Sequence, residues 1–319
     1  MIIGGFMFSV VLISSAMCLV MNSWLFVWVM LEVNTLAFCS LSKTLFSWKK
    51  GLSEWGLKYF IIQSIASSIL VLSCLYTKSA FVLNLVAVLG VISIILKAGG
   101  APFHQWFVDM VKKINWKIGA VLMTWQKLAP VYLLVFQLKK VAIIFILASM
   151  VVGAFLQFNK LKVLEILGLS SVFNLGWMIV SLMMNSKLFF LFLTLYWISV
   201  LIVVFVFSNS NLKTIYNDPS TKNAKWFAFI SIVNLAGIPP LGNFLVKMFI
   251  AYESVKIFLV LLFSIMIVVS SINLYIYMRM ANSILMKNSL PSKNNKEVSK
   301  TGYFLVLILT TFPLFIFAS

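Results

Sequence analysis

The chain has 319 residues, of which 62% are hydrophobic and only 10% are charged. A soluble domain needs more polar surface than this to cover its core, so the composition excludes an ordinary soluble protein and indicates a membrane protein. The net charge of +18 raises nucleic acid as a partner. However, the lysines lie in short loops between apolar runs, where positive charge sets membrane topology, so no nucleic-acid partner is expected.

Apolar runs separated by turn residues and lysines predict about eleven membrane-spanning helices, because one span uses roughly 20 apolar residues. The least apolar stretch, 286–300, is predicted to be a solvated loop. The predicted fold is therefore an all-α polytopic bundle, with one transmembrane domain over 1–319. In chain order the predicted spans are 2–21, 24–42, 55–77, 80–110, 117–138, 140–157, 163–184, 187–208, 226–252, 256–281 and 301–318.

Loop charges indicate the orientation. If the N-terminus lies on the matrix or cytoplasmic side, the loops of that side hold most of the loop lysines and Arg279, the only arginine. This matches the positive-inside rule. An odd number of spans then places the C-terminus on the opposite side. No basic or Arg- and Ser-rich segment precedes the first apolar run, so the first helix is expected to be retained.

Two predicted spans, 80–110 and 226–252, are long and interrupted, the first by KAGGAP and the second by GIPPLG. Glycine and proline break the helical ladder, and inside a membrane the freed carbonyls are tolerated only beside a cavity or buried polar groups. The residues predicted to break the helices are Gly99, Gly100, Pro102, Pro239 and Pro240.

The two interrupted spans occupy the fourth place in each of two successive sets of five. Because five is odd, the second set enters the membrane from the opposite side, which predicts an inverted repeat with a transport path near its midplane. The predicted division is a first repeat over 1–138, an inverted second repeat over 139–285, and a loop with a C-terminal helix over 286–319. The prediction rests on hydropathy and on the breaks.

Apart from charged residues close to span ends, four charged residues lie inside predicted spans: Glu32, Lys97, Lys127 and Lys247. A charge at mid-bilayer costs at least ~2.5–3.5 kcal/mol, so the presence of each charge calls for a functional or structural explanation. For Glu32 and Lys127, which lie deep in their spans, the alternative to a transport role is a polar contact between helices. For Lys97 and Lys247 the alternative is a lysine near a helix end that reaches the interface, but each lies within a few residues of a break.

A lysine removed from water releases its proton more readily, and a nearby carboxylate opposes that release. Glu32 with Lys97 is therefore a candidate proton switch, and Lys127 and Lys247 are candidate later stations, connected by Ser, Thr, Asn and water. The chain shows no P-loop and no GxGxxG motif. His104, the only histidine, is interpreted as a satisfied polar residue, with a relay role as the alternative.

Cys18, Cys39 and Cys74 show neither disulfide nor metal-site spacing. Two carboxylates near span ends, Asp109 and Glu165, are expected to be solvated.

Six motifs, in order, resemble the NADH-ubiquinone oxidoreductase chain 2 family, the antiporter-like membrane subunits of mitochondrial respiratory complex I. They are LEVNTLAF, KYFIIQSIASSI, LKAGGAPFHQW, LMTWQKLAP, SSVFNLGWM and GIPPLGNFLVK. The resemblance implies proton translocation across the mitochondrial inner membrane, no cofactor in this chain, and NADH, FMN, iron–sulfur clusters and ubiquinone bound by other subunits. It implies other complex I membrane subunits and lipids such as cardiolipin as partners. It assigns the proton relay to Glu32, Lys97, Lys127 and Lys247.

The sequence departs from the family pattern at several positions. Asn174 stands where the family usually has a histidine, which puts a proton route through that side chain in doubt; Ser170, Ser171 and water are the expected substitutes. The usual basic pair at the start of that helix is replaced by Leu164 and Glu165. Two other functions stay open, a stand-alone cation/proton antiporter subunit and a structural membrane scaffold whose lysines only position neighbours.

Overall fold

The computed structural model describes residues 2–21, 23–45, 52–75, 80–136, 139–210, 214, 222–239, 241–256 and 260–286. Within these residues the regular secondary structure is helical, apart from one isolated bridge between Lys162 and Thr214, and turns join the helices. It divides into two compact units, Met1–Ser149 and Met150–Ser319, which are described separately.

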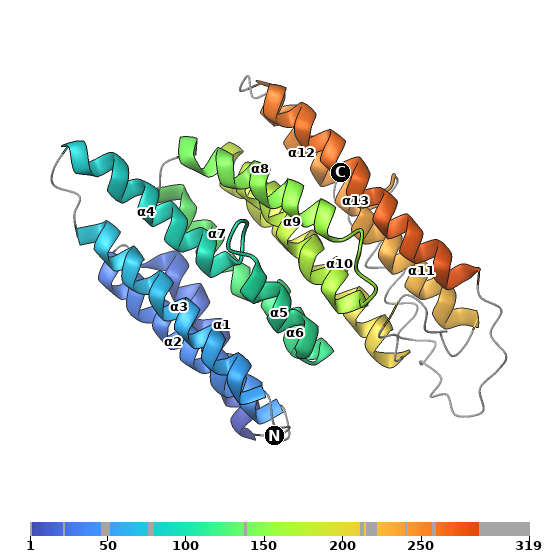
Figure 1. Ribbon diagram of the computed structural model, residues 1–319, viewed down its shortest axis with the longest axis horizontal. Coiled ribbons are helices and arrows are strands. Elements are labelled where there is room, and N and C mark those ends of the chain that lie inside the picture. Colours follow the sequence, from blue (N-terminus) through green and yellow to red (C-terminus); the bar gives the residue numbers. More distant parts are fainter. Residues whose placement is uncertain are drawn as a thin grey trace. The chain divides into compact units, whose positions relative to one another are not determined.

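The first unit begins with three long helices, α1 (Ile2–Val20), α2 (Trp24–Leu45) and α3 (Leu52–Leu75), each packed against the next (Figure 1). Two interrupted segments follow. The first is α4 (Ala80–Ala98) with α5 (Gln105–Lys113); α4 packs against α3. The second is α6 (Trp116–Met123), the 3₁₀ turn η1 (Trp125–Lys127), α7 (Leu128–Leu133) and a second 3₁₀ turn, η2 (Leu134–Phe136); α7 contacts α4 and α1.

Helix α8 (Lys139–Leu156) contributes residues to both units. The second unit continues with α9 (Val163–Met184), α10 (Ser186–Asn209), α11 (Lys222–Ala236), α12 (Gly242–Lys256) and α13 (Val260–Leu285). Helix α9 is its centre: it is almost wholly buried and packs against α10 and α12, while α11 packs against α13 and α10. At Gly153 of α8 a Cβ would lie 2.7 Å from the backbone nitrogen of Phe173, so glycine is what lets α8 approach α9 this closely.

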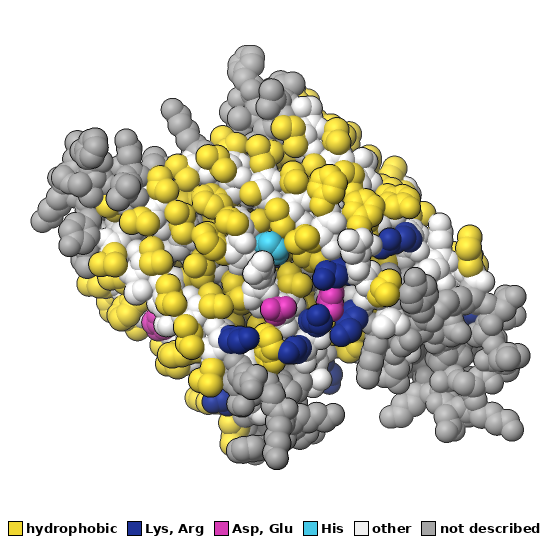
Figure 2. Space-filling view, viewed as in Figure 1, with side chains coloured by type: hydrophobic (Ala, Val, Ile, Leu, Met, Phe, Trp, Pro, Cys, Tyr) yellow, Lys and Arg dark blue, Asp and Glu magenta, His cyan; other side chains and the backbone are white. Residues whose placement is uncertain are grey.

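The surface has the character expected in lipid. Hydrophobic side chains cover most of the visible described surface (Figure 2), and large ones are well exposed, among them Phe6, Leu25, Leu201 and Val268. The described part holds seven helices that are long and apolar enough to cross a membrane. Many serines bond to a carbonyl of their own helix three or four residues earlier, as Ser149 does with Ile146. Such bonds satisfy hydroxyl groups that lipid cannot hydrate.

The predicted spans that fall in the described residues coincide with a helix or a group of short helices, and both predicted interruptions are present. The segment 117–138, predicted to be one continuous helix, is instead interrupted at η1. The predicted span 301–318 and nearly all of the predicted loop 286–300 lie outside the described residues. The division into inverted repeats stays a prediction.

Candidate functional site

The first helix break follows Lys97 by two residues. Gly99 has a φ of +71°, in the left-handed region that favours glycine. The Gly100 N–H donates to the Ile95 carbonyl at 3.0 Å, and the Gly99 N–H donates to the Leu96 carbonyl at 3.3 Å. This pair of bonds is the Schellman ending of a helix, and it places Lys97 in the last turn of α4.

Two side chains satisfy carbonyls that the break frees. Gln63 of α3 donates through Nε2 to the carbonyl of Lys97 at 3.2 Å, and Trp106 of α5 donates through Nε1 to the carbonyl of Leu96 at 3.2 Å. Beyond the break, His104 Nδ1 lies 3.2 Å from the carbonyl oxygen of Pro102, consistent with its interpretation as a satisfied polar residue. Pro102 itself follows a cis bond and is exposed.

Replacing Gln63 with leucine is expected to weaken this break. The Lys97 carbonyl would lose its side-chain donor in a buried position, which costs about 1–3 kcal/mol. The measurement is the fraction of the assembled membrane complex that survives a heating series on a native gel. Gln105→Leu, at an exposed position at the start of α5, is the control. Equal heat sensitivity in the two variants would contradict the expectation.

Glu32 of α2 is held between two hydroxyl groups. Its Oε1 accepts a hydrogen bond from Ser67 Oγ of α3, and its Oε2 accepts one from Thr35 Oγ1 at 3.4 Å. The carboxylate lies within electrostatic range of Lys97. Lys97 is 5% exposed, and its Nζ has no hydrogen-bond partner among the described residues. Glu32 therefore acts on Lys97 through space, and the ammonium is left able to bond to water.

Lys127 is the most deeply buried of the predicted charges, with 1% of its surface exposed. It ends η1, and its Nζ lies 4.7 Å from the ring centroid of Phe107, a cation–π distance. The interruption of the helix here follows from Pro130, which has no N–H for the carbonyl of Gln126 four residues earlier. At this point the helix narrows to a 3₁₀ turn, in which the Lys127 N–H donates to the Thr124 carbonyl.

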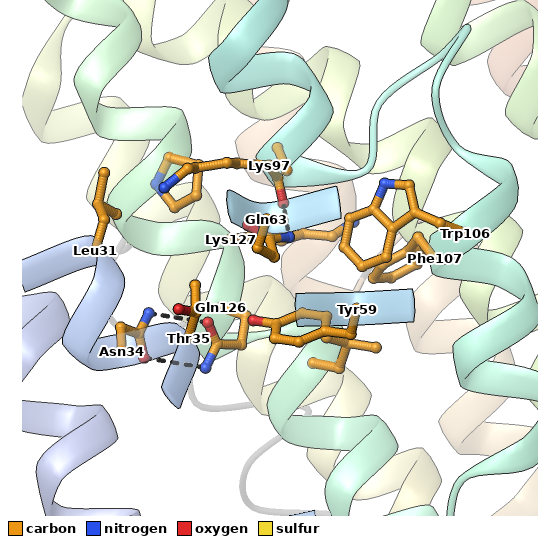
Figure 3. A pocket seen from close by; sticks show the side chains of 13 residues that line it. Leu31, Asn34, Thr35, Tyr59, Gln63, Lys97, Trp106, Phe107, Gln126 and Lys127 are labelled. Atoms are coloured by element: carbon orange, nitrogen blue, oxygen red, sulfur yellow. Dashed lines mark hydrogen bonds between the residues drawn. The ribbon is translucent and has the colours of Figure 1, made fainter. Parts of the chain in front are cut away.

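The interrupted segment is tied to the helix that carries Glu32. Asn34 Nδ2 donates to Gln126 Oε1 at 2.9 Å, and Gln126 Nε2 donates to Asn34 Oδ1 at 3.2 Å (Figure 3). Two reciprocal bonds between amides fix both side chains in orientation. They hold Lys127, the next residue, in register with α2.

Lys97 and Lys127 line one cavity (Figure 3), which leaves about 20 Å³ for the centre of a water molecule. That volume is enough for roughly one water. Glu32 adjoins the cavity through its hydroxyl partner Thr35. The structure therefore brings three of the four predicted relay residues to one polar site in the first unit. The other polar side chains that line the cavity are Asn34, Thr35, Tyr59, Gln63 and Gln126.

The second break has the same chemistry. Gly237, with a φ of +76°, ends α11, and its N–H donates to the carbonyls of Val233 and Asn234, each at 3.2 Å. Asn243 of α12 donates through Nδ2 to the Asn234 carbonyl at 2.9 Å. The ammonium of Lys247 lies beside Gly237: a Cβ built at Gly237 would be 3.3 Å from the Lys247 Nζ. A cation is favoured at the negative end of the α11 dipole.

The remaining surroundings of Lys247 are aromatic. Its Nζ lies 5.9 Å from the ring centroids of Phe173 and Trp177 of α9. Helix α11 ends at Gly237, before the predicted break residues Pro239 and Pro240. Pro239 follows in an exposed turn, and Pro240 lies outside the described residues. A glycine directly after an apolar run was the signal that could have found Gly237.

Two carboxylates outside the relay were expected to be solvated. Asp109 is exposed, as expected. Glu165 is not: it is 5% exposed and pairs with Lys160 at 3.7 Å and Lys162 at 3.9 Å. The two loop lysines make its burial possible. In the described part of the chain, no three His, Cys, Asp or Glu side chains converge as metal ligands.

Comparison with known proteins gives a family match over most of the chain. Residues 21–274 match the family described as NADH:quinone oxidoreductase/Mrp antiporter, transmembrane. NADH-ubiquinone oxidoreductase chain 2 of Aedes aegypti is 34% identical over 95% of this chain and 92% of its own length. The chain 2 protein of Anopheles gambiae is 33% identical over 86% and 84%.

Solved structures share the fold at low sequence identity. A chain of respiratory complex I from Thermus thermophilus with bound aureothin has a TM-score of 0.78 and is 19% identical, over 91% of this chain and 74% of that one. A chain of the Mrp complex from Dietzia sp. has a TM-score of 0.73 and is 14% identical, over 84% and 58%.

Proposed function

Because this chain belongs to the NADH:quinone oxidoreductase/Mrp antiporter family and, within it, to NADH-ubiquinone oxidoreductase chain 2, we propose that it is a proton-translocating core membrane subunit of respiratory complex I. The observation that carries the proposal is the single cavity lined by Lys97 and Lys127, with Glu32 beside it. Glu32 modulates the proton on Lys97, and water in the cavity passes it to Lys127. Lys247, at the second break, is a further station.

The chain supplies the proton path and not the energy. Moving one charge against the membrane potential costs about 2.3 kcal/mol per 100 mV. Electron transfer from NADH to ubiquinone in other subunits provides that energy. NADH, FMN, iron–sulfur clusters and ubiquinone are bound there, and this chain holds no cofactor of its own. Its partners are neighbouring antiporter-like subunits and lipids such as cardiolipin.

The membrane arrangement is part of the proposal: about eleven spans, the first ten forming two inverted sets of five, in the mitochondrial inner membrane. The N-terminus faces the matrix and the C-terminus faces the intermembrane space. The matched endings of α4 and α11, each at a glycine with positive φ, support the inverted repeat.

Replacing Glu32 with glutamine is expected to slow NADH-driven proton pumping. The amide is close in size to the carboxylate but cannot act as a negative charge on Lys97, so the switch loses its control. Pumping is measured as the initial rate of proton uptake or release by sealed vesicles, and the expected loss is at least about tenfold. Asp109→Asn, at an exposed carboxylate, is the control. Equal rates in the two variants would contradict the role of Glu32.

A stand-alone cation/proton antiporter is the second candidate, favoured by the fold shared with the Mrp complex chain. Sodium-dependent transport by the isolated chain in vesicles would support it over a complex I subunit. The relatives above 30% identity that carry the chain 2 name favour complex I.

A further inference from the structure

A polar cluster outside the relay residues lies in the core of the second unit. It consists of Ser170 and Ser171 of α9, Tyr196 of α10 and Tyr277 of α13, which are called here the tyrosine–serine cluster. Each of these side chains is 2% exposed or less. The Tyr196 hydroxyl lies close to Ser171, the Tyr277 hydroxyl lies close to Ser170, and the two tyrosines are within electrostatic range of each other. Three helices therefore contribute hydroxyl groups to one buried point.

The two serines already use their own protons. Ser170 Oγ donates to the Leu167 carbonyl at 2.8 Å, and Ser171 Oγ donates to the Gly168 carbonyl at 2.6 Å. Their oxygens are left to act as acceptors in the cluster. The Tyr196 and Tyr277 hydroxyl groups do not complete a hydrogen bond with any of the described residues.

Two other buried polar atoms of the second unit share this lack of a partner. Among the described residues, Trp177 Nε1 of α9 and Asn273 Oδ1 of α13 are also buried without a hydrogen-bond partner. Asn273 lies one turn before Tyr277 on the same face of α13. A buried polar group left unpaired costs about 1–3 kcal/mol, and the lipid chains supply no hydrogen-bonding groups to reduce that cost. Buried donors and acceptors without a protein partner are the setting in which proteins hold ordered water.

The cluster adjoins the Lys247 site along α9. Ser170, Phe173, Asn174 and Trp177 follow one another at spacings of three, one and three residues, so they share one helix face. Lys247 Nζ lies against the Phe173 and Trp177 rings. Ser170 is therefore about one helical turn, or ~5 Å of rise, from Phe173, and about two turns, or ~10 Å, from Trp177. Asn174, on the same face, carries no titratable proton.

We propose that the tyrosine–serine cluster binds ordered water and forms a neutral proton-transfer station beside Lys247, doing the work that a titratable side chain at Asn174 would do. The station rests on the relay function proposed above. Each tyrosine hydroxyl and each water accepts one proton on one side and releases one on the other. The O–H bonds that break are replaced by O–H bonds that form, so the cluster ends unchanged and no redox partner is needed.

The test is the double variant Tyr196→Phe with Tyr277→Phe in the assembled complex. Each change removes one oxygen and keeps the ring that fills the core. NADH-driven pumping is expected to fall at least about tenfold. The solvent deuterium isotope effect on the remaining rate is expected to rise, which a purely structural role would not produce. Tyr275→Phe, two residues away on α13 and 58% exposed, is the control and should match the unmodified complex.

The outcomes separate the station from the relay. An unchanged rate and isotope effect in the double variant, with pumping still lost in Lys127→Met, would overturn the station and leave the relay standing. Unchanged pumping in both would overturn the proposed function itself. If the double variant does not assemble, Ser171→Ala provides the same isotope readout with a smaller change. A density map with water bonded to both tyrosine hydroxyl groups supports the station, and a map in which side chains fill that space contradicts it.

Discussion

Replacing Lys127 with methionine is expected to abolish NADH-driven proton pumping in an assembled complex. Lys127 is 1% exposed and lines the cavity that it shares with Lys97. Methionine is similar in length and flexible enough to fill the same space. It also removes the cost of burying an ammonium group, so assembly is not expected to suffer. The proton, however, loses the site that receives it after Lys97.

The measurement compares pumping by vesicles that contain equal amounts of intact complex. The expected loss is about 10²-fold or more, the range that a positioned proton-transfer group contributes. Lys117→Met is the matched control: it removes a lysine from the same predicted span, but at an exposed position. A Lys127→Met complex that pumps as well as this control would show that the lysine serves only as a polar contact between helices.

Replacing Gly99 with valine is expected to remove the chain from the membrane complex. The φ of +71° is unfavourable for a residue with a side chain, and most of all for a β-branched one. A Cβ at this position would also lie 2.8 Å from the Cβ of Phe107. Left-handed strain costs about 1–2 kcal/mol, and overpacking adds about 1–3 kcal/mol. Together these are a large part of the stability of a typical domain.

Assembly is measured as the amount of intact complex on a native gel at equal expression. Gly5→Val is the control, because a Cβ at Gly5 meets nothing within 4 Å. Gly99→Ala should fall between the two, since alanine brings the Cβ without the branch. Normal assembly of Gly99→Val would mean that the helix does not need to end at this residue.

The sequence was sufficient to locate the helices and the first break. Apolar runs of the right length predict spans because, in lipid, a backbone must satisfy its own hydrogen bonds, and a helix does so within one segment. The break at Gly99 and Gly100 could be predicted because two consecutive glycines after a long apolar run favour a helix ending with a left-handed residue. Burial of Lys97 and Lys127 followed from their place inside those runs and is observed.

Other features depend on contacts between helices and could not be read along the chain. The interruption at Lys127 follows from Pro130, but the proline acts on the carbonyl four residues earlier and left the apolar run intact. Glu165 was expected to be solvated because it lies near a helix end, and it is buried because two loop lysines fold over it. The cavity between Lys97 and Lys127 is lined by residues of seven helical segments, α2, α3, α4, α5, α6, η1 and α7.

The most direct test of the proton relay is a density map of the assembled complex at a resolution that places ordered water. The relay predicts water in the cavity between Lys97 and Lys127, hydrogen-bonded to the Lys97 ammonium and to the polar groups that line the cavity. A cavity closed by side chains, with no water joining the two lysines, would contradict it.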